Sequence, residues 1–108
     1  MNGKELTGRD LSHLLTETLG IQTEWPMGWN EPRMIPRLFD EIVARMPENS
    51  EISVGHLPDG TYTGVASPIG SVEAHEIHIS YGSDPSEALI RLLLEVIQQS
   101  RKNNENTH

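Results

Sequence analysis

The sequence predicts a single α+β domain, in which a short antiparallel sheet of about three strands packs with three helices in the order α-α-β-β-β-α. Apolar residues recur at helical spacing towards both ends of the chain, alternate with polar residues in the middle, and are separated there by turns rich in Pro, Asp and Gly. The 108 residues are enough for one domain and too few for two. We place the domain at residues 1–98 and expect residues 99–108 to be a polar, disordered tail.

The first helix is predicted to run from Thr7 to Gly20. Thr7 is a residue type that caps helix starts, and a glycine such as Gly20 closes helix ends. Between them four leucines share one helical face, namely Leu11, Leu14, Leu15 and Leu19.

Residues 21–33 contain both tryptophans and two prolines. Each proline removes a backbone donor, so we predict a structured loop here, with one short strand near residues 21–25. We expect Trp25 and Trp29 to cover the core, and the alternative is that they stack on a ligand.

A second helix is predicted at residues 34–46, where pairs of apolar residues repeat at four-residue steps. Pro36 fits the first turn of this helix, where a missing N–H is harmless, and Pro47 ends it. A hairpin follows, in which strands at residues 51–56 and 61–66 flank a turn at Pro58-Asp59-Gly60.

The third strand is predicted at His75–Tyr81. Alternation puts His75, Ile77, Ile79 and Tyr81 on one face and predicts that Glu76, His78 and Ser80 face solvent.

The last helix begins where Asp84 is the predicted N-cap, Pro85 the first helical residue and Glu87 the acid of the first turn. Its residues from Leu89 to Ile97 are apolar over more than half of the circumference, so the helix should pack centrally. We therefore expect a homo-oligomer, with this helix or an exposed sheet edge at the contact. The alternative is that the first helix covers the extra leucines within one subunit.

Three segments together resemble the phage ABA sandwich, a family of small phage-encoded domains. They are the helix at residues 34–46, the hairpin from Ile52 to Ala66 with Asp59-Gly60 at its centre, and the segment Gly82–Ile97, which opens as Gly82-Ser83-Asp84-Pro85-Ser86-Glu87-Ala88-Leu89. The resemblance covers about residues 33–98. It implies a phage or prophage origin and no known catalysis, and it assigns no functional residues.

Composition excludes several classes of function. Sixteen acidic and eight basic residues give a net charge of -8, which argues against nucleic acid binding. The longest apolar run, Leu92–Leu94, is too short to span a membrane, and residues 1–5 are too polar for a secretory signal. The chain has no cysteine, which removes thiolate catalysis and disulfides. We expect a cytoplasmic protein without a cofactor, in the host cytoplasm if it is phage-encoded.

The five histidines are the candidates for metal or acid–base chemistry. His75 and His78 would point to opposite faces of a strand, whereas His56 and His75 would share a face, with Glu73 as a third ligand. No serine lies in a Gly-x-Ser-x-Gly motif. We therefore expect structural histidines and a protein that is not an enzyme. The alternative is a small metal-dependent or hydrolytic enzyme that uses His56, His75 and Glu73.

From Met46 to Ile90 the chain has no Lys or Arg but seven acids, which are Glu48, Glu51, Asp59, Glu73, Glu76, Asp84 and Glu87. One interpretation is solubility. The other is an acidic face that binds a basic protein surface, formed by Glu51, Asp59, Glu73, Glu76 and His78. This second interpretation predicts a non-catalytic interaction module, a phage or prophage accessory protein that blocks a basic host surface or sequesters a ligand.

Overall fold

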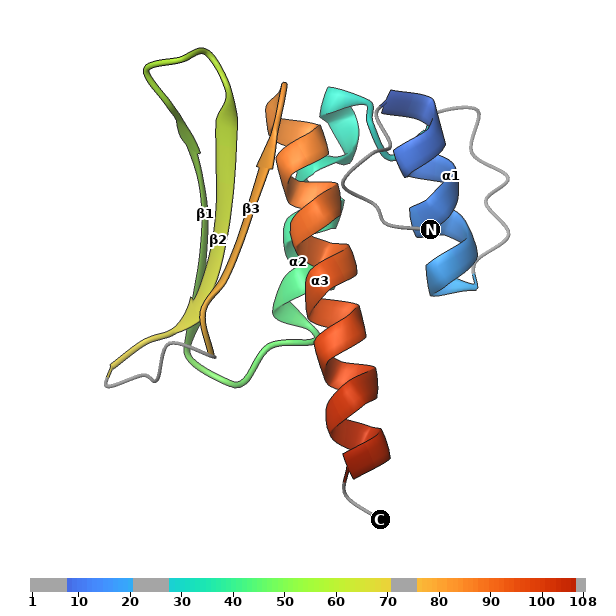
Figure 1. Cartoon of the computed structure of the whole chain (residues 1–108), viewed down its shortest axis with the longest axis vertical. Helices are drawn as coiled ribbons and strands as arrows, with labels where there is room; N and C mark the ends of the chain where they lie inside the picture. The colour runs from blue at the N-terminus through green and yellow to red at the C-terminus, as the bar shows by residue number, and fades with distance from the viewer. Residues whose placement is uncertain (1–7, 21–27, 71–75, 107–108) are drawn as a thin grey trace.

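The computed structural model describes residues 8–20, 28–70 and 76–106, with side chains described as far as residue 100. Within these residues, three α-helices pack with a three-stranded antiparallel sheet in the predicted order, so the predicted α+β class is confirmed. Figure 1 shows the sheet on one side of α3, with α1 on the other. The elements are α1 (Gly8–Leu19), the short 3-10 helix η2 (Pro32–Met34), α2 (Ile35–Val43), β1 (Ser50–His56), β2 (Tyr62–Pro68), β3 (His78–Gly82) and α3 (Pro85–Asn106).

Trp29 joins the loop after α1 to the core. It is buried, its backbone N–H donates a hydrogen bond to Ser12 Oγ (2.7 Å), and its Nε1–H donates to Thr16 Oγ1 (3.1 Å). The prediction that Trp29 covers the core is confirmed. Trp25 and the predicted strand at residues 21–25 lie outside the described residues.

The ends of α1 and α2 follow local rules. Gly20 closes α1 in the left-handed conformation (φ 69°), as predicted for a glycine that ends a helix. Pro36 lies in the first turn of α2, also as predicted. Regular helix ends at Val43, three residues earlier than expected, and turns continue from there to Met46.

The hairpin of β1 and β2 forms as predicted around its turn. The Leu57 N–H donates to the Thr61 carbonyl (2.8 Å), and the Gly60 N–H donates back to the Leu57 carbonyl (3.0 Å). Gly60 has a φ of 93°, a conformation that favours glycine. β2 is the central strand of the order β1-β2-β3.

The faces of β3 are the reverse of the prediction. His78 and Ser80, which were expected in solvent, are buried against the helices. Ile79 and Tyr81 point the other way and are 48% and 56% exposed, and Ile77 before the strand is exposed too. β3 begins at His78, and the predicted starting residue His75 lies outside the described residues.

This reversal follows from the close approach of α3 to the sheet. The residues of the sheet beneath the first turn of α3 are small, namely Gly64, Ser80 and Gly82. A Cβ at Gly82 would lie 2.5 Å from the Ala88 nitrogen, and one at Gly64 would lie 3.2 Å from the Ala88 carbonyl oxygen. The Ser80 hydroxyl donates to that same oxygen (2.6 Å). Larger side chains do not fit in so short a gap, so the isoleucine and tyrosine of β3 face outward although they are more apolar.

α3 begins as predicted, with the Glu87 N–H donating to the Asp84 side chain (2.8 Å) and Pro85 as the first helical residue. It continues to Asn106, through most of the polar residues that we expected to form a disordered tail from residue 99. The extension contains no Pro or Gly to stop the helix, and Gln99, Arg101, Lys102 and Glu105 within it are good helix formers.

The core is built around α3, which packs on the sheet on one side and on α1 and α2 on the other. The buried apolar residues of α3 are Ala88, Leu89, Ile90, Leu92, Leu93, Leu94, Val96 and Ile97. The other helices contribute Leu11, Leu15, Leu38 and Ile42. Both layers belong to one chain. α1 therefore covers the extra leucines of α3 within one subunit. This is the alternative that we set against an oligomer formed through α3.

We predict that Leu93→Ala lowers the free energy of unfolding by about 2–5 kcal/mol, because it removes buried methyl groups and leaves a cavity. Val43→Ala is the matched control, since Val43 is 54% exposed and its truncation should change stability little. Urea denaturation of both variants measures the difference. Equal midpoints would contradict the central place of α3.

We predict that Gly82→Ala is destabilising by about 1–3 kcal/mol, because its Cβ would collide with the backbone of α3. Gly55→Ala is the control, since a Cβ there would meet Thr63 Cγ2 at an ordinary 3.6 Å. Thermal melting of the two variants followed by circular dichroism tests the contact. A Gly82→Ala protein as stable as Gly55→Ala would show that α3 does not lie so close.

Candidate functional site

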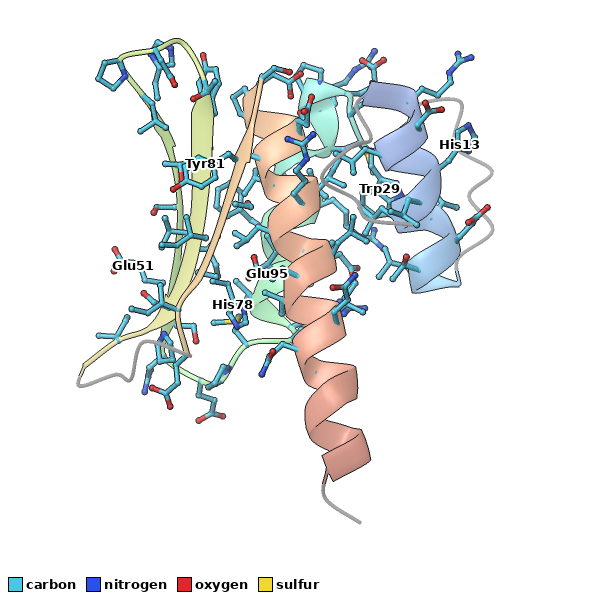
Figure 2. All side chains as sticks on the ribbon, in the orientation of Figure 1. His13, Trp29, Glu51, His78, Tyr81 and Glu95 are labelled. Atoms are coloured by element: carbon cyan, nitrogen blue, oxygen red, sulfur yellow. The ribbon has the colours of Figure 1, made fainter. Side chains whose placement is uncertain are left out.

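The sheet has one face that the described helices leave uncovered, which we call the outer face (Figure 1). The strand register places Glu51, Ser53 and Gly55 of β1, Thr63, Val65 and Ser67 of β2, and Ile79 and Tyr81 of β3 on it. Figure 2 shows Glu51 and Tyr81 on this side of the sheet, away from α3.

The β3 side of the outer face is apolar and aromatic. Ile79 pairs with Val65, and Tyr81 pairs with Thr63, so these four side chains are neighbours. Ile69, directly after β2, is 65% exposed. Exposed apolar neighbours such as Ile79 and Tyr81, beside the half-buried Val65, are typical of interaction surfaces.

The acidic residues of the predicted site do not form one cluster. Glu51 lies on the outer face near the start of β1, and Asp59 lies in the turn beyond its end. At the rise of an extended strand these positions are separated by about 20 Å. The structure therefore brings Glu51, but not Asp59, to the outer face.

Asp59 has a structural role in the hairpin turn. Its Oδ1 accepts hydrogen bonds from the Thr61 hydroxyl (2.6 Å) and from the Thr61 N–H (3.0 Å). These two bonds, the hydroxyl first, hold the pKa of Asp59 below its ordinary value of 3.8, and His56 adds a small effect in the same direction. The carboxylate is thus engaged in fixing the turn.

Glu76 and His78 lie at the end of the sheet where β3 begins. Both line a groove of about 480 Å³ between the end of α2, the end of β2 and α3, together with residues that include Arg45, Met46, Pro68, Val96 and Gln99. His78 Nδ1 is 3.9 Å from Glu95 Oε1, beyond hydrogen-bond length, and the ring faces α3 (Figure 2). The prediction that His78 shares a solvent-exposed face with Glu76 is wrong, since the inner face of β3 buries it. Glu73 lies outside the described residues.

Two more acids of the segment from Met46 to Ile90, which has no Lys or Arg, stabilise the fold. Asp84 caps α3. Glu87 is buried, accepts a hydrogen bond from the Ser83 hydroxyl (2.8 Å) and pairs with Arg91 (2.8 Å). The acidic surface is therefore smaller than the charge count of the segment implies.

The residues of the alternative enzyme hypothesis are not assembled within the described part of the chain. His56 lies at the turn end of β1, where its ring centroid is 4.7 Å from that of Tyr62. His75 and Glu73 lie outside the described residues. Among the residues that the structure describes, no group of three or more His, Asp or Glu is placed to hold a metal ion.

Comparisons with known proteins give no relative from which a function can be transferred. No family model, no curated protein and no solved structure matches the chain. Within residues 8–20, 28–70 and 76–106, no helix is long and apolar enough to cross a membrane.

Sequence reasoning placed Ile79 and Tyr81 on the face opposite the solvent-exposed one and so missed the apolar part of the outer face. A signal for it was present in the small residues at alternate positions of two strands, Gly64 and Ala66 in β2 and Ser80 and Gly82 in β3. Small residues at this spacing mark the strand face on which a helix packs closely, and thereby place the large neighbours on the opposite face.

We predict that Asp59→Asn is less stable than the wild type at neutral pH and equally stable in acid. The folded pKa of Asp59 lies below 3.8, so its contribution is fully present above that value and is lost as the pH falls through the folded pKa. Urea midpoints of both proteins along an acid series measure the convergence. Thr61→Ala removes the donating hydroxyl, so in that background the loss of stability caused by Asp59→Asn should shrink. If it does not shrink, the lowered pKa of Asp59 comes from another group.

Proposed function

We propose that this protein is a non-catalytic interaction module that binds a basic protein surface through the outer face of its sheet. The observation that carries the proposal is the exposure of Ile79 and Tyr81, at 48% and 56%, on a face that no described helix covers. Burying such side chains in a complex is favourable, roughly in proportion to the apolar area removed from water.

The composition of the face suits protein recognition. Tyrosine combines a large apolar ring with a polar hydroxyl and is enriched among the residues that dominate binding energy. Tyr81 and Ile79 project from a strand that β2 holds in register, so little backbone conformational entropy is lost on binding.

Charge supports a basic partner. Glu51 is exposed at the other side of the outer face, and none of the three strands contains Lys or Arg. Arg91, at the margin of β3, pairs with Glu87 and donates to the Tyr81 carbonyl, so its charge is largely balanced. A partner with Lys or Arg beside an apolar patch is complementary, and its association should be steered by charge and weakened by salt.

The resemblance to the phage ABA sandwich supports a phage or prophage accessory protein. On this proposal the protein acts in the host cytoplasm, where it occupies a basic surface of a host protein. The proposal requires a binding face and no catalytic group.

We predict that the double variant Ile79→Thr, Tyr81→Thr folds normally but retains its partner at least about tenfold less well than the wild type. Threonine keeps a high strand propensity while it removes the ring and the aliphatic arm. The measurement is capture on the full-length chain from a lysate of the organism that encodes it, at low and high salt, with quantification by mass spectrometry. Glu51→Lys should weaken capture of the same protein mainly at low salt.

Two variants serve as controls. Val43→Thr alters another exposed apolar side chain, and Glu17→Lys makes the same charge change as Glu51→Lys on α1. Both should retain the partner at the wild-type level. The proposed face would be contradicted if the double variant retained the partner as well as the wild type does. It would also be contradicted if the controls reduced retention of the partner equally.

A further inference from the structure

The two edges of the sheet are not equivalent. At the β3 edge, Arg91 Nη1 donates to the Tyr81 carbonyl oxygen (2.6 Å), and Glu87 holds the same guanidinium. This covers a backbone acceptor that an added strand would need. β1 forms the other edge of the three-stranded sheet.

The edge of β1 that faces away from β2 presents an ordered row of donors and acceptors. The Leu57 N–H donates to the Thr61 carbonyl, and the Asn49 carbonyl accepts from the Ile69 N–H. Both residues are odd-numbered, so the odd-numbered residues of β1 direct their N–H and C=O groups to β2. The even-numbered residues therefore direct theirs outward, and within the described residues no strand pairs with them. They are Ser50, Ile52, Val54 and His56.

β1 lacks the features by which proteins commonly protect an edge. It contains no Lys and no Pro, and its register with β2 runs without a bulge from Ser50 to His56. A regular strand of seven residues, four of which direct hydrogen-bonding groups outward, forms a template for another extended strand.

β1 is also complementary to a second copy of itself. In an antiparallel pair centred on Ser53 all seven residues of both strands overlap. Ile52 then faces Val54 of the second copy on the inner face, and Glu51 faces Gly55 of the second copy on the outer face. The one charged residue of the strand thus avoids its twin.

The helix layer favours extension of the sheet on this side. α2 and α3 both contact β1, whereas α3 lies mainly beneath β2 and β3. Ile35 and Phe39 of α2 are half-buried, and Val43, one turn further, is 54% exposed. Val43 therefore leaves exposed apolar surface on a helix that contacts β1.

We propose that the protein forms a twofold symmetric dimer through antiparallel pairing of β1 with β1 of a second copy, which produces a continuous six-stranded sheet. The hydrogen bonds come from the outward groups of the even-numbered residues, and Ser53 meets its own twin across the axis as a non-hydrogen-bonded pair. This inference does not depend on the identity of the partner of the outer face.

The first test is the solution mass of the full-length chain by sedimentation equilibrium. The mass should rise with protein concentration to twice that of the monomer. Each copy carries a net charge of -8, so salt should strengthen the dimer by screening repulsion. Capture of a basic partner should respond to salt in the opposite sense, so a failure of one proposal is distinguishable from a failure of the other. A mass that stays monomeric at every concentration and salt level overturns the dimer.

The second test locates the contact with single cysteines, which are clean probes because the chain has none. A non-hydrogen-bonded pair brings its Cα atoms to about 4.5 Å, within the range of a disulfide. Ser53→Cys should therefore form a disulfide-linked dimer on mild oxidation. Val65→Cys is the matched control, since Val65 is the neighbour of Ser53 on the central strand and its twin in the proposed dimer is too distant. Faster linkage through Val65→Cys would indicate stacking of two outer faces and would overturn edge pairing.

A charge variant tests the same register without a covalent bond. Ser53→Lys and Ser53→Glu each place like charges opposite each other at the axis, and each alone should be monomeric. Their equimolar mixture should regain the mass of a dimer. A mixture that stays monomeric although the wild type dimerises would overturn the pairing centred on Ser53.

Discussion

The close contact of α3 with β2 and β3 is the constraint on which the rest of the structure depends. The backbone of Ala88 lies so near the sheet that the residues beneath it must be as small as Gly64, Ser80 and Gly82. Ser80 fixes the spacing by donating a hydrogen bond to the Ala88 carbonyl. The contact fills one side of α3, and the leucines on its other side then require the cover of α1 and α2. The layer order and the orientation of β3 both follow from this one contact.

Where the information for an element is local, the sequence was sufficient to predict it. Gly20 closes α1, Asp84 caps α3 and Gly60 permits the hairpin turn through interactions within a few residues of each site. The orientation of β3 is not local, since it depends on a helix that follows in the sequence and packs across two strands. Alternation alone placed Ile79 and Tyr81 opposite the predicted solvent face, because hydrophobic alternation ignores how much space the opposite layer leaves.

The candidate site could be predicted in part for the same reason. Glu51 was identified because it is charged and because the alternation of β1 also places it on the exposed face. His78 was misplaced together with the rest of β3. Asp59, Asp84 and Glu87 show a second limit of sequence reasoning, since a count of acids does not separate carboxylates that cap, bridge or stabilise a turn from those that create a surface field.

The proposed dimer has a geometric consequence for the proposed binding face. A twofold axis that relates two antiparallel edge strands of one continuous sheet runs perpendicular to that sheet, so both outer faces lie on the same side. The Ile79 and Tyr81 pairs of the two copies then flank a centre that carries both Glu51 side chains. A partner with two basic apolar patches at the matching separation gains avidity from such an arrangement, whereas a small monomeric partner gains none. The same uncovered sheet thus serves both proposals without competition, because association uses the backbone at its β1 edge and recognition uses the side chains of its outer face.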